Sequence, residues 1–397
     1  MMSVWSSLVG QGDAVAKLSE AAASARAIVA SRAGSAARED ARSMSHAWLI
    51  TGPPGSGRSV AARAFAAALQ CTGEEVGCGT CPGCRTTMGR TNADVLFAAT
   101  ETSIINVETA RSLVLQAQSS PSQGLWRVIV VEDADRLGEA GANALLKAIE
   151  EPPEHTVWLL CAPSPEDMIA TIRSRCRHLG LRIPTASAVA DLLVREGVAT
   201  PEVALEAARA AQSHIGLARA LAADPEMRAR RRAIVTAPVS VRSVGEAVLA
   251  ADRLLETAKA QADAQVSERN AREKAELLRQ LGMEEDERAT KASRTLIRQL
   301  EEDQKRRSKR ALTDAIDRAL IDLLAIYRDV LMTQVGGDGE LINTDLADLV
   351  RSIADESTPR QTLSRVDHIE TARRRLKSNG NTLLVLEDMA ISLRPQA

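Results

Sequence analysis

The sequence predicts an α/β domain, with a parallel sheet flanked by helices, followed by two all-helical domains. Between residues 47 and 184, short apolar runs alternate with helical stretches, which is the pattern of a parallel sheet covered by helices. After Pro184 every segment has helical periodicity, with breaks at Pro184-Thr185 and Asp224-Pro225. Because 397 residues exceed one ordinary domain, we expect three domains, at residues 1–184, 185–237 and 238–397.

Five apolar runs are the candidate strands of the sheet. They lie at residues 47–51, 93–98, 127–132, 157–162 and 178–181. An alanine-rich stretch at 187–222 predicts the helices of the second domain. In the third domain an amphipathic helix is predicted at residues 312–331. The charged segment 258–310 is a candidate projecting helical hairpin with a break near Gly282.

Composition and charge exclude several classes of protein. The 50 basic and 52 acidic residues give a net charge of -2, so any contact with DNA must be local. No apolar run approaches the roughly 18 residues of a membrane span, and the N-terminus lacks a signal pattern, so we expect a cytosolic protein with no membrane contact. The dense basic run at 305–310 is either a phosphate contact or a solvated helix face with acid–base pairs, and the pattern favours the second.

A phosphate-binding loop is predicted directly after the first strand. The segment 52–59 fits the pattern G-x-x-x-x-G-K-[ST], except that Arg58 replaces the lysine. Its glycines let successive N–H groups face a phosphate, and Ser59 can offer its hydroxyl to Mg²⁺. The broad guanidinium of Arg58 predicts weakened ATP or ADP binding and weaker hydrolysis, and a loop that no longer binds nucleotide is the alternative. The candidate nucleotide-binding residues are Gly52, Pro53, Gly55, Gly57, Arg58 and Ser59.

Two acids follow the third predicted strand. A strand of this kind normally ends with Asp, which binds Mg²⁺, and then Glu, which polarises the attacking water. Here Glu132 precedes Asp133, so the group at the water-activating position lacks one methylene of reach. Solvated acids at the end of a strand are the alternative interpretation.

Four closely spaced cysteines predict a structural metal site. Cys71, Cys78, Cys81 and Cys84 follow the pattern C-x₆-C-x₂-C-x₂-C, with glycines and a proline between them. Four thiolates can close a tetrahedral Zn²⁺ shell and leave no position open for a substrate. We therefore expect zinc to stabilise the fold of a small inserted module. Two disulfides are the alternative, which an oxidising compartment would favour. Cys161 and Cys176 lie far from this group in sequence and are expected to be buried apolar residues.

The segment 143–153, NALLKAIEEPP, resembles a signature of bacterial clamp-loader subunits, which have an AAA+ P-loop core. Leu8-Val9-Gly10-Gln11, the strand before the P-loop, the cysteine module and Ser174-Arg175-Cys176 resemble further motifs of the same family, and together they span residues 8–220. The resemblance implies that residues 185–237 form a helical lid and that residues 238–397 form a helical collar for oligomerisation.

The chain departs from the ATP-hydrolysing members of that family at three places. These are Arg58, the reversed pair Glu132-Asp133, and the sensor 1 region, where Ala162 and Pro163 replace hydroxyl residues. The resemblance therefore implies a subunit with weak or no ATPase activity of its own. It also implies that Arg175 is an arginine finger acting in trans, and that Arg219 corresponds to the sensor 2 arginine.

The implied partners are gamma/tau and delta subunits, the sliding clamp, and primer–template DNA reached through the complex. Two other functions stay open at this point. An active ATPase of the same fold would need Arg58 to replace lysine adequately. A zinc-dependent DNA-binding module would need DNA affinity that depends on the cysteines.

Overall fold

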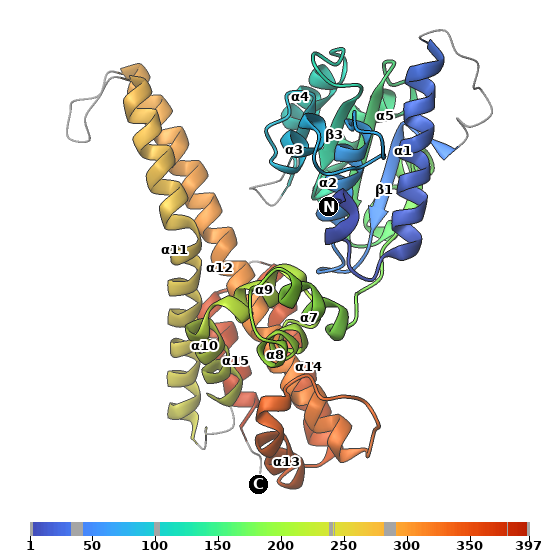
Figure 1. The fold of residues 1–397 in the computed structure, drawn as a ribbon. Helices are drawn as coiled ribbons and strands as arrows, with labels where there is room; N and C mark the ends of the chain where they lie inside the picture. The colour runs from blue at the N-terminus through green and yellow to red at the C-terminus, as the bar shows by residue number, and fades with distance from the viewer. Residues whose placement is uncertain are drawn as a thin grey trace. The chain divides into compact units, whose positions relative to one another are not determined.

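The computed structural model describes residues 3–32, 43–98, 104–237, 241, 243–281, 291–378 and 380–394 (Figure 1). These residues form two compact units, 1–219 and 220–397, and the boundary falls inside one helix. Among the described residues, no helix is long and apolar enough to cross a membrane. The division into three domains remains a prediction, because the contacts resolve two units.

The first unit contains a five-stranded parallel sheet in the order β2-β3-β4-β1-β5. All five predicted strands are present, and no predicted end differs from the observed one by more than two residues. The strands are β1 (Ala47–Thr51), β2 (Val95–Ala98), β3 (Arg127–Val131), β4 (Thr156–Ala162) and β5 (Arg177–Gly180). β1 pairs with β4 and β5, so that Ile50 lies opposite both Cys161 and Leu179.

Helices cover both faces of this sheet, as a doubly covered parallel sheet requires. Trp48 and Ile50 pack with α1 (Gly12–Arg32) and α2 (Arg58–Leu69) on one face. Leu49 packs with α4 (Val107–Ala117) and α5 (Glu139–Glu150) on the other face. The alternation follows from the period of two in a strand. The shorter elements of this part are η1 (Val4–Ser7), α3 (Pro82–Met88), η3 (Ala134–Arg136), η4 (Pro165–Asp167) and α6 (Ala170–Arg173).

Three short helices follow the sheet and span the predicted alanine-rich stretch, with one residue more at each end. They are α7 (Ala186–Arg195), α8 (Pro201–Ala210) and α9 (Ile215–Ala223). Thr185 caps α7 by accepting a hydrogen bond from the N–H of Ala188, and Pro201 occupies the first turn of α8. The predicted breaker at Pro184-Thr185 therefore marks the start of a helix.

The second unit is entirely helical over its described residues. Its elements are α10 (Pro225–Thr236), α11 (Val244–Leu281), α12 (Lys291–Gln334), η6 (Thr344–Leu346), α13 (Ala347–Asp355), α14 (Pro359–Lys377) and α15 (Thr382–Ser392). Leu320, Leu323 and Tyr327 of α12 form the centre of its core. The buried Arg231 of α10 donates to Asp322 of α12, so α10 packs within the second unit.

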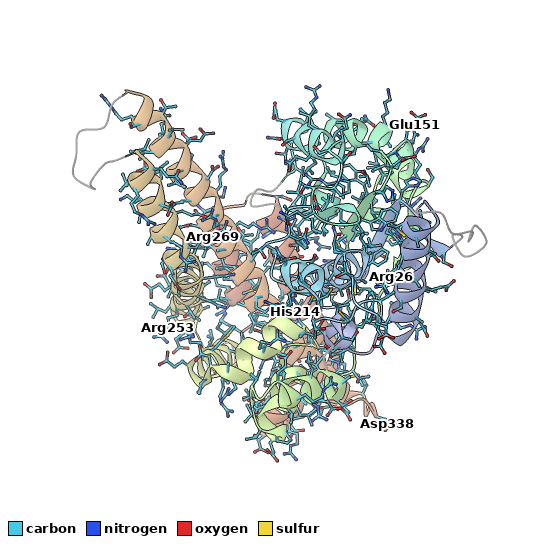
Figure 2. All side chains as sticks on the ribbon, turned by 45° about the horizontal axis from the view of Figure 1, so that its top comes forward. Arg26, Glu151, His214, Arg253, Arg269 and Asp338 are labelled. Carbon is cyan, nitrogen blue, oxygen red and sulfur yellow. The ribbon has the colours of Figure 1, made fainter. Side chains whose placement is uncertain are left out.

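The charged segment forms the predicted hairpin, and its basic run is largely neutralised. α11 and α12 pack along each other, and the predicted break at Gly282 lies outside the described residues (Figure 1). Arg306 pairs with Asp303, Arg307 pairs with Glu273 across the hairpin, and Arg310 pairs with Asp314. Figure 2 shows many long side chains, Arg269 among them, projecting from this hairpin. The pairing agrees with a solvated, salt-bridged face.

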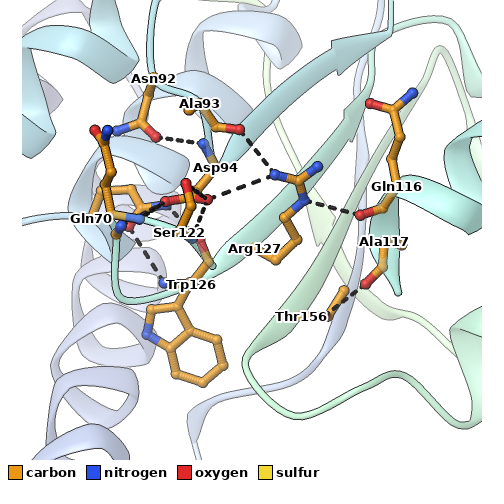
Figure 3. A network of polar contacts seen from close by, with 12 residues as sticks. Gln70, Asn92, Ala93, Asp94, Gln116, Ala117, Ser122, Trp126, Arg127 and Thr156 are labelled. Carbon is orange, nitrogen blue, oxygen red and sulfur yellow. Dashed lines mark hydrogen bonds and ion pairs between the residues drawn. The ribbon is translucent and has the colours of Figure 1, made fainter. Parts of the chain in front are cut away.

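A buried carboxylate anchors the loop that leads into β3 (Figure 3). Asp94, fully buried, accepts hydrogen bonds from the N–H groups of Ser122, Gln123 and Gly124 at 2.6–2.8 Å and lies 3.7 Å from Arg127. Burial alone would raise the pKa of Asp94, but these amide donors outweigh it and lower the pKa. Gln70, the residue that caps the end of α2, accepts a further hydrogen bond from the N–H of Leu125 at 2.9 Å.

We expect Asp94→Ala to lower the free energy of unfolding of the first unit by about 3 kcal/mol or more. The substitution leaves three N–H groups without an acceptor, and each buried donor that loses its acceptor costs about 1–3 kcal/mol. All four tryptophans lie in this unit, so urea unfolding followed by their fluorescence measures it. The exposed Asp191 supplies the control variant Asp191→Ala. Equal stability of the two variants would contradict the anchoring role.

The same carboxylate predicts a pH dependence. Because its folded pKa is lowered, its stabilisation is complete above the unfolded value of about 3.9 and is lost as the pH falls through the folded value. The stability difference between the native chain and Asp94→Ala should therefore shrink below about pH 4.

Candidate functional site

The loop after β1 has the backbone of a phosphate cradle. Gly55 and Gly57 have φ values of 91° and 89°, in the left-handed region that glycine adopts at no steric cost. A Cβ atom at Gly52 would lie 2.5 Å from the Ser56 hydroxyl oxygen and 2.9 Å from the Leu181 carbonyl oxygen. The glycines at the predicted positions are therefore required by the fold, and α2 begins at Arg58 as expected.

The side chain of Arg58 turns back onto this loop. Its Nη1 donates to the carbonyl oxygen of Gly52 at 2.6 Å, and the Gly52 N–H in turn donates to the carbonyl of Pro163 at 3.1 Å. Pro163 belongs to the predicted sensor 1 region, and the neighbouring Cys161 is fully buried, which raises its pKa to about 12. Arg58, which stands at the position of the P-loop lysine, therefore uses one of its N–H donors in a hydrogen bond to the loop itself.

Two side chains brace the loop from other parts of the first unit. Gln11 donates to the carbonyls of Ser56 at 3.3 Å and Arg182 at 2.6 Å, joining the loop to the end of β5. His214, just before α9 (Figure 2), lies so close that a Cβ atom at Gly55 would sit 2.8 Å from its Cα. Gln212 and Ser213 reach this place through positive φ values of 48° and 63°. The backbone between α8 and α9 therefore packs directly against the loop.

The first of the two acids at the end of β3 is engaged by an arginine. Nη2 of Arg90 lies 2.5 Å from Oε1 of Glu132, whose side chain is 13% exposed. Arg63 of α2 lies nearby, and burial followed by repulsion from Arg90 lowers its pKa. Burial also raises the pKa of Asp135, with a further contribution from Asp133. Glu132 is thus already neutralised by a cation of the chain, which opposes the binding of Mg²⁺ at this carboxylate.

No pattern in the sequence pointed to Arg90. It follows α3 and Gly89, has a positive φ of 58°, and its guanidinium lies 4.9 Å from the centre of the Phe97 ring. The sequence analysis did not identify His214 either. The signal that could have found it is the Gln-Ser-His turn between two short helices, but its contact with Gly55 is made between distant segments.

The four predicted cysteines come together. Their Sγ atoms all lie within 4.8 Å of one another, with 3.7 Å between Cys71 and Cys78 and 3.9 Å between Cys81 and Cys71. Bonds of about 2.3 Å at tetrahedral angles would place sulfur atoms about 3.8 Å apart, so the group fits a Zn²⁺ ion. The described cysteines are free thiols, with none of them joined in a disulfide.

The local backbone favours the thiolate form of Cys78 and Cys81. The N–H of Cys81 donates to Sγ of Cys78, and the N–H of Cys84 donates to Sγ of Cys81, each at 3.4 Å. Burial alone would raise the pKa of Cys81, but hydrogen bonds from Cys84 and Thr72 outweigh it and lower the pKa to about 6. Burial raises the pKa of Cys84. Arg26 of α1 (Figure 2) donates to the Cys71 carbonyl at 3.0 Å and supports the module from outside.

The two remaining predicted arginines differ in what holds them. Arg175 follows α6, is 39% exposed, and pairs with Glu150 at the end of α5. Arg219 of α9 donates through Nε and Nη2 to the carboxylate of Glu196 at 2.7–3.0 Å, which holds it within the lid. A cavity of about 610 Å³ lies in the second unit, and none of the predicted site residues lines it.

Two family models match separate parts of the chain. The model described as DNA polymerase III, delta subunit, matches residues 35–185, and a second model, for the C-terminal part of the delta subunit, matches residues 287–394. Together they cover more than half of the chain. The chain belongs to the DNA polymerase III clamp-loader family.

Relatives in this clamp-loader family include two kinds of subunit. The delta' subunit of Escherichia coli is 33% identical over 47% of this chain and 57% of that protein. The gamma/tau subunit of Mycobacterium tuberculosis is 35% identical over 39% of this chain and 28% of that protein. A gamma subunit-related protein from Thermotoga maritima has a TM-score of 0.40 at 17% identity, covering 87% of this chain and 93% of that chain. The chain thus spans 28% to 57% of the two relatives' lengths.

We expect the purified chain to contain about one equivalent of zinc, and Cys81→Ala to lose it, as measured by mass spectrometry of metals. The cysteine module lacks a core of its own, so metal loss should also lower the urea midpoint of the first unit. Cys176→Ala, outside the cluster, is the control. Equal zinc content in both variants would contradict the assignment.

Proposed function

We propose that this chain is the delta-prime type of subunit of a bacterial clamp loader. In this role it hydrolyses ATP weakly or not at all, supplies Arg175 in trans to a neighbouring gamma/tau ATP site, and helps to load the sliding clamp on primed DNA. The observation that carries the proposal is the contrast between the cations. Arg58 donates to Gly52 and Arg90 pairs with Glu132, so both act within the candidate nucleotide site itself. Arg175 instead contacts Glu150, Thr171 and Ser174, away from that loop, and its Nη2 has no hydrogen-bond acceptor among the described residues.

An exposed arginine at a subunit boundary has a physical role in phosphoryl transfer. Charge spreads over the transferred group in the transition state, and a fixed, permanently charged guanidinium stabilises it without reorganisation. Such a donor contributes only when the neighbouring subunit brings its nucleotide close. Arg175 would therefore make hydrolysis by the neighbour depend on correct assembly of the ring, with gamma/tau and delta subunits as partners. Such a complex works in the cytosol.

The cysteine cluster has a supporting part in this proposal. Cys71, Cys78, Cys81 and Cys84 would hold a Zn²⁺ ion with no open coordination position, so the metal would stabilise the module and take no part in hydrolysis. The third possible function, a zinc-dependent DNA-binding module, gains no support from the basic run, whose arginines are paired.

Arg175→Ala should lower DNA-stimulated ATP hydrolysis by the reconstituted complex at least about tenfold at the site that Arg175 faces, because the transition-state charge loses its donor. Steady-state phosphate release in the presence of clamp and primed DNA measures this. Arg173→Ala, an exposed arginine two residues earlier, is the matched control. Unchanged hydrolysis and clamp loading in Arg175→Ala would contradict the proposed role.

An active ATPase is the second candidate function. The similarity to gamma/tau subunits favours it, and so does Ser56, whose buried hydroxyl has no partner among the described residues and faces into the loop. We expect the isolated chain to show no Mg²⁺-dependent ATP turnover above that of Ser59→Ala, in a coupled assay. Turnover that Ser59→Ala abolishes would favour the second candidate over the first.

A further inference from the structure

The guanidinium of Arg175 is held at two of its three nitrogens by its own chain. Nε donates to Oε1 of Glu150, and Nη1 donates to the carbonyl of Thr171 at 2.9 Å and the hydroxyl of Ser174 at 3.2 Å. None of the described residues accepts a hydrogen bond from Nη2. Hydrogen bonds therefore hold the guanidinium at Nε and Nη1, while Nη2 remains available to a ligand.

The backbone beneath this side chain is anchored in the core of the first unit. The N–H of Arg175 donates to the carbonyl of Ile172 at 3.0 Å, and Ile172 is fully buried. The next residue, Cys176, packs against the same apolar cluster. The main freedom left to Arg175 is thus in its own torsions, and a long arginine side chain has many rotamers to lose.

The position of Glu150 is unfavourable for the helix that carries it. Glu150 is the last residue of α5, where the partial negative charge of the helix C-terminus repels a carboxylate. Local helix physics therefore gives no reason for an acid here. The contact with Arg175, 25 residues later in the sequence, supplies one.

We propose that Glu150 is a positioning residue for Arg175, holding its guanidinium by Nε so that Nη2 stays available to a ligand. The inference rests on the proposed role of Arg175 as a finger in trans. A permanently charged donor stabilises a transition state best when its orientation is set beforehand, because reorientation then costs nothing during the reaction. Glu150 itself touches no nucleotide in this arrangement and acts through Arg175.

The test uses the reconstituted clamp loader with five variants of this chain. They are Glu150→Ala, Glu150→Asp, Glu151→Gln, Arg175→Ala and the double variant Glu150→Ala/Arg175→Ala. Glu151 is the adjacent exposed acid at the end of the same helix (Figure 2) and serves as the matched control. The readouts are kcat and KM for DNA-stimulated ATP hydrolysis, and tryptophan fluorescence in urea as a check on the fold.

We expect Glu150→Ala to lower kcat about three- to tenfold with KM nearly unchanged, because a misplaced donor weakens the transition state more than the bound substrate. Glu150→Asp should restore part of the loss, and Glu151→Gln should match the native chain. The double variant should lose no more than Arg175→Ala alone, since Glu150 then has nothing to position.

Each contrary outcome has its own meaning. If Arg175→Ala is fully active, the proposed finger fails and the positioning role fails with it. If Arg175→Ala is impaired but Glu150→Ala is not, the finger stands and the positioning role is overturned. A rise in kcat in Glu150→Ala would show that Glu150 masks the arginine, and losses that multiply in the double variant would show a purely structural role. Either result overturns the inference.

Discussion

Parallel pairing of fully buried strands determines where every part of the candidate site lies. All residues of β1 and β4 are buried, and β1 lies between β4 and β5. Because parallel strands point the same way, the loops after β1, β3, β4 and β5 leave from one edge of the sheet. This edge therefore carries the P-loop, Glu132, Pro163 and Arg182, which come from four separate parts of the sequence.

The site formed at this edge has the backbone of a nucleotide cradle but a different distribution of charge. In a working site, cations face the phosphates and carboxylates face a metal ion. Here Arg58 donates to the loop and Arg90 neutralises Glu132, so each of the two groups that would face a ligand has a partner within the chain. Gln11 and His214 add contacts that join the loop to β5 and to the lid. The contacts stabilise the first unit without a nucleotide, which is consistent with a subunit whose chemistry takes place on its neighbour.

The cysteine module is connected to that charge arrangement through the chain itself. Cys81 caps α3, Cys84 lies within α3, and Arg90 follows two residues after the helix ends. A metal ion that holds α3 in place would therefore also hold the base of the arginine that reaches Glu132. The module and the altered site, which look independent in the sequence, share one short helix.

The sequence by itself determined the strands, the glycine positions of the loop, the cysteine cluster and the family. These features are local in the chain: periodicity, a fixed spacing of small residues and a run of closely spaced ligands. Their physical causes operate over a few residues, so they can be read directly. The sequence also identified Arg58, Glu132 and Arg175 as unusual or important, but not what each contacts.

Tertiary structure alone decided the partners of those charges. Glu132 meets Arg90, 42 residues earlier, and Arg175 meets Glu150, 25 residues earlier. It also brought His214 of the lid against Gly55, and it assigned α10 to the second unit through the buried pair of Arg231 and Asp322. Such contacts depend on how the sheet and helices pack, and no spacing in the chain encodes them. The same arginine-rich sequence could have left these cations solvated, and only packing decided which acid or carbonyl each of them contacts.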